Sequence, residues 1–179
     1  MTLTAKRGTV ALVDKREARI PSLVADLASP DPAVRTKARE ALVAFGKLTV
    51  PSLIRLLSHR RPHVRWEAAK ALCAIADPLS ASALVNALDD RDGDVRWLAA
   101  EGLAALGRDG LQPLLAALLE RARSGWFCEG AHHVCHTLVT RRRLGPILRP
   151  LLAALGQPEP EIAVPPAAYT ALSRLRELS

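Results

Sequence analysis

The fold of this chain follows from one stretch, residues 62–72, which reads PHVRWEAAKAL. Residues 92–103 read DGDVRWLAAEGL and residues 31–42 read DPAVRTKAREAL, so a Val-Arg pair recurs at intervals of 30 and 31 residues. Alanine and leucine follow the pair in each copy. A chain that repeats itself at a period of this size is typical of a helical solenoid, in which each repeat stacks on its neighbours. An all-α fold is therefore predicted.

Two degenerate copies of the motif begin at Trp126 and Val164, after the three that begin at Val34, Val64 and Val95. A second helical pattern alternates with the motif and in most copies carries a proline near its start. Proline is tolerated there because the first helical turn has no intrahelical acceptor for its N–H. The alternation predicts five helical pairs, each with the proline-type helix first and the motif helix second. Their approximate bounds are 15–46, 47–76, 79–107, 109–139 and 143–178, in one repeat domain over 15–179 that follows an N-terminal cap or arm at 1–14.

The motif and its period resemble HEAT repeats, in particular the short HEAT-like repeats of the phycobilin lyases. The resemblance implies a right-handed α-solenoid of about five helical pairs, with the motif helices on the concave side. It also implies that the recurrent arginines bridge to an acid in a neighbouring repeat. Arg35, Arg65 and Arg96 would then form a structural ladder, with Asp31 and Asp92 as helix caps or bridge partners.

Composition narrows the class of protein and the kind of partner. The net charge of +7 and the pI near 10.0 make anionic partners worth considering, although repeat arrays also use arginine structurally. Three cysteines are too few for a disulfide framework. The sequence has no signal-peptide pattern and no apolar run of membrane-spanning length. A cytoplasmic protein without membrane partners is expected.

The helical wheel predicts which motif residues line the concave groove. At about 100° per residue, Val64, Ala68 and Leu72 share the core stripe, while the third, fourth and seventh motif residues lie off it. In the first four copies these predicted groove residues are Thr36, Lys37, Glu40, Trp66, Glu67, Lys70, Trp97, Leu98, Glu101, Cys128, Glu129 and His132. Trp66 and Trp97 are either anchors for a partner or packing residues between repeats.

The fourth repeat concentrates thiols and imidazoles. Spacings of four, seven and eight residues from Cys128 are predicted to place His132, Cys135 and His136 on its side of the helix. Such side chains can bind zinc or another soft transition metal, and the alternative is buried cysteines with metal-free histidines. His133 is expected to angle toward the core as a hydrogen-bonded structural histidine. No cofactor is expected.

The favoured function is a non-enzymatic scaffold or adaptor that binds a protein or peptide segment in the groove. A nucleic-acid or phosphate-binding module is the alternative. It rests on basic turns at His59, Arg60, Arg61 and His63, at Arg121 and Arg123, and at residues 141–143.

The resemblance to phycobilin lyases keeps a metal- or tetrapyrrole-binding role as a second alternative. An enzyme is the least favoured class, because no catalytic triad order or phosphate-binding glycine loop is present. The resemblance to HEAT-like proteins also brings in deoxyhypusine hydroxylase, whose inner helices hold iron through His-Glu pairs. The matching positions here are Trp66-Glu67, Trp97-Leu98 and Cys128-Glu129, so the histidines are missing.

Overall fold

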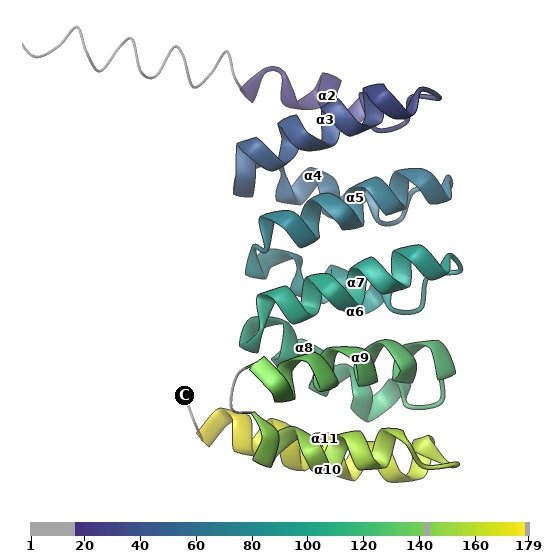
Figure 1. Ribbon diagram of the computed structural model, residues 1–179, viewed down its shortest axis with the longest axis vertical. Coiled ribbons are helices and arrows are strands. Elements are labelled where there is room, and N and C mark those ends of the chain that lie inside the picture. The colour runs from purple at the N-terminus through teal and green to yellow at the C-terminus, as the bar shows by residue number, and fades with distance from the viewer. Residues whose placement is uncertain (1–16, 142–143, 178–179) are drawn as a thin grey trace, which may run out of the picture.

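The computed structural model describes residues 17–141 and 144–177, and within them the chain is an all-α solenoid (Figure 1). The all-α prediction is confirmed, because the described residues contain helices and no strand. The predicted N-terminal cap at 1–14 lies outside the described residues. The helices are α2 (Ile20–Asp26), α3 (Pro32–Phe45), α4 (Val50–Leu56), α5 (Pro62–Ile75), α6 (Ala81–Ala87), α7 (Gly93–Leu106), α8 (Arg108–Arg121), α9 (Gly125–Arg141), α10 (Gly145–Leu155) and α11 (Pro160–Glu177), with 3-10 turns at Gly46–Thr49 and Pro78–Ser80.

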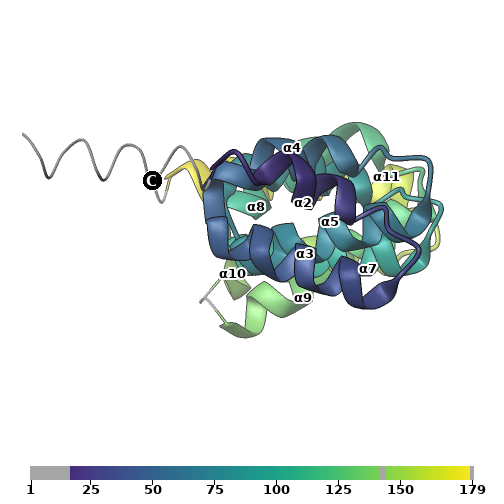
Figure 2. The same ribbon diagram turned by 90° about the horizontal axis from the view of Figure 1, so that it is seen from above.

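The helices are arranged in two layers, which are visible in the view along the stack (Figure 2). In the first, here called the motif layer, α3, α5, α7, α9 and α10 each pack against the next. In the second, the outer layer, α6, α8 and α11 pack in the same way, and α2 and α4 cover α3 and α5. Among the described residues, no helix combines the length and the apolar character needed to cross a membrane.

The fifth pair has the opposite order from the one predicted. The sequence pattern places the proline-type helix first, in the outer layer, yet α10 packs on α9 and α11 packs on α8. The 14-residue α8 presents a row of buried leucines that includes Leu111, Leu115 and Leu118, and α11 packs on this helix. The apolar stripe of the motif still faces inward in α11, where Val164, Ala168 and Leu172 are buried, so the same stripe serves in the outer layer.

Side-chain caps begin the motif helices α3, α7 and α9, whereas Arg61, the N-cap residue of α5, makes no such hydrogen bond. The carboxylate of Asp31 accepts a hydrogen bond from Ala33 N at 2.8 Å, and that of Asp92 accepts from Asp94 N at 3.0 Å. At α9 the capping side chain is Ser124, whose Oγ accepts from Phe127 N at 3.2 Å. Each cap pairs N–H groups that the first helical turn leaves without intrahelical acceptors.

The period lengthens at α9, because Ser124 lies 32 residues after the equivalent cap Asp92. Phe127 is fully buried at the place that Val95 holds on α7, while Trp126 is 49% exposed. The prediction that the fourth motif copy begins at Trp126 is therefore wrong by one residue. A shift of one residue turns every side chain of a helix by about 100° and changes which of them face the core.

Candidate functional site

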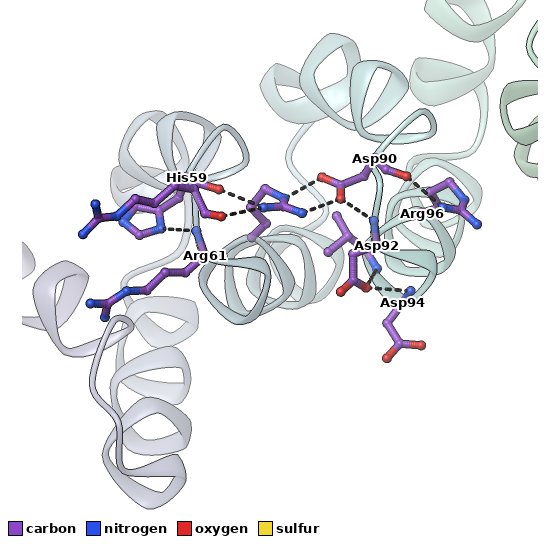
Figure 3. Close-up of polar contacts among 9 residues, drawn as sticks. His59, Arg61, Asp90, Asp92, Asp94 and Arg96 are labelled. Atoms are coloured by element: carbon purple, nitrogen blue, oxygen red, sulfur yellow. Dashed lines mark hydrogen bonds and ion pairs between the residues drawn. The ribbon is translucent and has the colours of Figure 1, made fainter.

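The recurrent arginines tie the first three repeats together. Arg65 Nε and Nη2 donate to the two carboxylate oxygens of Asp90, each at 2.7 Å, and its Nη1 donates to His59 O at 3.0 Å. Figure 3 shows Asp90 between these contacts and the backbone of Asp92, whose N–H it also accepts. The hydrogen bonds to Asp90, with the negative charges of Asp90 and Asp92, raise the pKa of Arg65 above its ordinary value, against the opposing effect of burial.

The ladder begins one repeat earlier, where Arg35 and Arg39 of α3 contact Glu67 of α5. Arg39 Nη1 lies 2.5 Å from one of its carboxylate oxygens and Arg35 Nε lies 3.4 Å from the other. Glu67 is only 4% exposed, so it is an interior counter-ion for two arginines of the preceding repeat. Its predicted place on the groove floor is corrected accordingly, because its side chain turns into the interface between α3 and α5.

The ladder changes character at Arg96. Its Nη1 donates to Asp90 O at 2.8 Å, a contact that Figure 3 shows, but within 17–141 and 144–177 it makes no ion pair. Its guanidinium instead lies over the Trp126 ring, with Cζ 4.5 Å from the ring centroid. A cation–π contact thus joins α7 to α9 where a salt bridge joins the earlier repeats.

Trp66 and Trp97 occupy equivalent motif positions in different surroundings. Trp66 is half-buried against the core, with Lys70 Nζ 4.4 Å above its ring and Arg39 Cζ at 5.7 Å. Trp97 is 56% exposed. One repeat after Lys70 the residue is Glu101, whose charge cannot cover an indole face in the same way.

A pocket of about 390 Å³ lies between α7 and α9, and we refer to it as the α7–α9 pocket. Two half-exposed tryptophans, three histidines and three small residues dominate its lining. The lining residues are Gly93, Arg96, Trp97, Ala100, Trp126, Glu129, Gly130, His132, His133 and His136. A cavity with aromatic walls and a few polar groups is a common form of ligand or hot-spot site.

His133 fixes one wall of the pocket. Its ring centroid lies 4.4 Å from that of Trp97 at an interplanar angle of 49°, and its Nε2 lies 2.6 Å from Glu101 Oε1. The expected hydrogen bond of His133 is present, but the side chain faces the pocket and not the core. The corrected register explains this, because His133 and not His132 follows Glu101 at the period of 32.

The predicted group of Cys128, His132, Cys135 and His136 does not converge on one point. The two cysteines are buried, at 7% and 0% exposure, whereas His132 and His136 are exposed on the pocket side. The one-residue register shift turns both thiols into the core. Burial raises the pKa of Cys135 to about 12, and burial followed by the charges of Asp89 and Glu161 raises that of Cys128. Across the part of the chain that the structure describes, no three His, Cys, Asp or Glu side chains are placed to hold a metal ion.

The comparisons with known proteins agree with the repeat geometry. A family model described as HEAT repeats matches residues 20–104. The complex of CpcE and CpcF of phycocyanin lyase from Nostoc sp. PCC7120 is structurally similar, with 25% identity, a TM-score of 0.56, and coverage of 84% of this chain and 98% of that chain. Residues 20–104 match HEAT repeats, and the described solenoid as a whole is HEAT-like. Its resemblance to the phycobilin-lyase type of HEAT-like repeat is confirmed.

Two other solved structures are similar to this HEAT-like solenoid at a lower level. One is an engineered protein, with 22% identity, a TM-score of 0.43, and coverage of 94% of this chain and 83% of that chain. The other is a designed armadillo repeat protein in complex with the peptide (KR)4, with 21% identity, a TM-score of 0.41, and coverage of 88% and 91%. No curated protein matches the chain.

Several basic side chains of the predicted basic turns make contacts within the protein. Arg121 forms an ion pair with Asp89 and donates to Asn86 Oδ1 at 3.0 Å, with its Cζ 4.2 Å from the Phe127 ring centroid. Arg61 Nη1 donates to Ala28 O at 3.2 Å. Burial, and then the charges of Arg35, Arg61 and His59, lower the pKa of His63. The side chains of residues 141–143 lie outside the described part of the chain.

A shallow pocket beside these turns has mixed charge. It is lined by Arg35, Pro62, His63, Trp66, Glu67, Asp92 and Asp94. The carboxylates of Asp92 and Asp94 oppose a phosphate at this place. The other predicted groove residues differ in exposure. The exposed ones are Lys37, Glu40, Lys70, Glu129 and His132, of which Glu129 and His132 line the α7–α9 pocket. Thr36 and Glu101 are half-buried, and Leu98 is half-buried and packs against the core.

Apart from the small residues Gly93, Ala100 and Gly130, the sequence interpretation missed three residues of the α7–α9 pocket. The constant period predicts a core position for Trp126 and a core-facing side chain for His133, and it gives Arg96 a role in the ladder alone. A signal was available, because Ser124 precedes Phe127 by three residues as Asp92 precedes Val95. Alignment of helix caps, in place of alignment by a constant period, would have identified Phe127 as the buried residue.

Proposed function

We propose that this protein is a non-enzymatic interaction scaffold that binds a segment of a partner protein on its motif layer. The α7–α9 pocket is the anchoring site. One observation carries the proposal: Trp97 and Trp126 are 56% and 49% exposed beside a pocket of about 390 Å³. Half-exposed tryptophans next to a cavity are typical hot-spot residues, because they add large apolar contact area when a partner covers them.

Each tryptophan is supported on one side and free for contact on another. His133 contacts Trp97, and the guanidinium of Arg96 covers one face of Trp126. Supporting contacts reduce the rotamer freedom that binding would otherwise remove, so less free energy is lost when a partner docks. The pocket is thus suited to an apolar or aromatic side chain of the bound segment.

Acidic side chains near the pocket favour a segment that also carries basic residues. Glu129 lines the pocket and makes no ion pair among the described residues, and Asp94 is exposed in the first turn of α7. Both can attract lysine or arginine that flanks the apolar anchor. A segment with an aromatic residue between basic residues is the complementary sequence.

A selection from a random peptide library tests this proposal. The strongest peptides selected on the wild-type chain are titrated into a Trp97→Ala/Trp126→Ala variant, and affinity is expected to fall at least about tenfold. Tyr169→Ala is the matched control, because Tyr169 is an exposed aromatic residue on α11 in the outer layer. Equal binding by the double variant and the wild type would refute the pocket as the anchoring site.

A tetrapyrrole-binding role of the bilin-lyase kind is a second candidate. The likeness to the phycocyanin lyase complex supports it, at 25% identity and a TM-score of 0.56. Titration with biliverdin, a linear tetrapyrrole, tests this candidate through visible absorption and induced circular dichroism. A saturable spectral change that is weakened by Trp97→Ala would favour it over peptide binding. An unchanged spectrum at all protein concentrations would exclude it.

A further inference from the structure

We propose that His132 and His136 form a binding site for a divalent transition-metal ion at the rim of the α7–α9 pocket. The inference is independent of the proposed function, because it concerns a ligand that the chain binds without a partner. The proposed site uses two imidazoles and no thiol. It therefore differs from the site of Cys128, His132, Cys135 and His136 that the sequence spacing predicts.

The two rings are arranged as a pair on one face of α9. They lie four residues apart, with ring centroids 6.2 Å apart and planes inclined by 17°. Side chains at this spacing stand one above the other on a helix. Both residues are exposed and both line the pocket, so a hydrated ion reaches their nitrogens from solvent.

Both imidazoles are also free of competing interactions. Within the described part of the chain, neither ring makes a hydrogen bond or an ion pair, and their one recorded contact is with each other. Two of the other histidines differ in this respect. His133 is bound to Glu101, and His59 Nδ1 accepts from Arg61 N at 3.1 Å.

Imidazole nitrogens suit Zn²⁺, Cu²⁺ and Ni²⁺, and affinity is generally highest for Cu²⁺ among these ions. Two protein ligands leave coordination positions open, which water fills. Glu129 precedes His132 by three residues and His136 by seven, and it makes no ion pair among the described residues. Its carboxylate can become a third ligand after a change of rotamer, which agrees with the finding that no three such groups converge in the present arrangement.

The thiols do not compete for this ion at the pocket. Cys135 is fully buried and Cys128 is 7% exposed with its Sγ 3.3 Å from Ala122 O, so neither reaches the rim. The half-buried Cys73 belongs to α5, and burial followed by the charge of Glu101 raises its pKa. A metal bound by Cys73 would therefore be a separate site, which a variant distinguishes.

The test is a competition titration of Zn²⁺ against a chromophoric chelator, with the full chain purified without a histidine tag. One ion per chain is expected for the wild type. His132→Ala and His136→Ala are each expected to weaken Zn²⁺ binding at least about tenfold. Loss of a residue that only hydrogen-bonds to a metal ligand already weakens metal affinity by about this factor, so loss of a ligand should do at least as much. His63→Ala and Cys73→Ser are the matched controls and are expected to keep the wild-type affinity.

A second readout locates the ion. Cu²⁺ quenches nearby indole fluorescence, so addition of Cu²⁺ is expected to quench Trp97 and Trp126 in the wild type and not in the His132→Ala/His136→Ala variant. Glu129→Gln tests whether the Glu129 carboxylate is a third ligand. A weaker Zn²⁺ affinity in this variant is expected if the carboxylate coordinates the ion. Unchanged Zn²⁺ affinity in the double histidine variant, or loss of binding in Cys73→Ser, would overturn the proposal.

Discussion

Cys128 holds on α9 the place that Arg96 holds on α7. The Cys128 thiol contacts Ala122 O at 3.3 Å and Arg96 Nη1 donates to Asp90 O at 2.8 Å, in each case to the backbone carbonyl six residues earlier. Arg65 and Arg35 make the same contact to His59 O and Ser29 O. The fourth repeat therefore keeps the tie to its own turn but carries no charge at this position. Arg96 already lacks an acid partner among the described residues, so the salt-bridge ladder ends at the Arg65–Asp90 pair, before the pocket.

The buried thiol of Cys135 makes stability depend on pH in a defined direction. Burial raises its pKa from 9.0 to about 12, so the folded state holds a proton that the unfolded state releases above about pH 9. This contribution to stability is fully present below pH 9 and is lost as pH rises toward 12. The free energy of unfolding should fall more steeply above pH 9 in the wild type than in Cys135→Ala, by up to about 1.4 kcal/mol per pH unit. Urea denaturation at pH 8, 9, 10 and 11 measures the difference, and parallel curves would contradict the assignment.

Removal of Arg65 should destabilise the fold more than removal of Arg96. The Arg65–Asp90 pair has side-chain exposures of only 12% and 9%, and Arg65→Ala leaves the Asp90 carboxylate nearly buried without its partner. A loss of about 2–4 kcal/mol is expected, slightly below that for a fully buried pair. Arg96 has no acid partner among the described residues, so Arg96→Ala should cost about 1 kcal/mol. Both values come from urea denaturation, and equal losses would show that the ladder does not distinguish the two positions.

The two equivalent tryptophans should differ in their effect on stability. Trp66 is half-buried against the core, so Trp66→Ala is expected to lower the free energy of unfolding by about 1–3 kcal/mol, less than for a fully buried aromatic residue. Trp97 is 56% exposed, and Trp97→Ala should cost less than about 1 kcal/mol. Thermal denaturation of the two single variants measures this contrast. A larger loss for Trp97→Ala would mean that Trp97 packs between repeats and is not an anchor.

Close packing between α7 and α8 should make Gly110 intolerant of a side chain. A Cβ at Gly110 would lie 2.5 Å from the backbone oxygen of Leu103, so α8 would have to move away from α7. Gly110→Ala is expected to cost about 1–3 kcal/mol through this overpacking. Gly125→Ala is the control, since a Cβ there meets nothing within 4 Å and the effect should stay within about 0.5 kcal/mol. Equal stability of the two variants in urea would argue against the close approach of the helices.

The sequence was sufficient to predict the all-α solenoid, because the Val-Arg motif fixes a helix by its caps, its core stripe and its repetition. It was not sufficient for the order of α10 and α11. Both are apolar enough to occupy either layer, and the choice depends on how well each covers α8 and α9. Packing between helices far apart in the sequence decides that, and the local pattern at Val164 does not report it.

The candidate site was only partly predicted for a related reason. Trp97, Glu101, Glu129 and His132 were placed on the groove side, whereas Trp126 and His133 were misplaced by a one-residue change in period. Alanine and cysteine both fit buried positions, so apolarity alone allows two registers around residues 126–135. The buried ring of Phe127 and the cap at Ser124 settle the register in the structure.

The most direct test of the α7–α9 pocket uses the indole N–H signals of the three tryptophans in a ¹H–¹⁵N spectrum, assigned with single Trp→Phe variants. A peptide selected on the wild-type chain is titrated into the labelled protein. The indole signals of Trp97 and Trp126 are expected to shift together with one dissociation constant, while that of Trp66 changes little. A shift confined to Trp66, or unchanged indole signals at saturating peptide, would contradict the assignment of the pocket as the binding site.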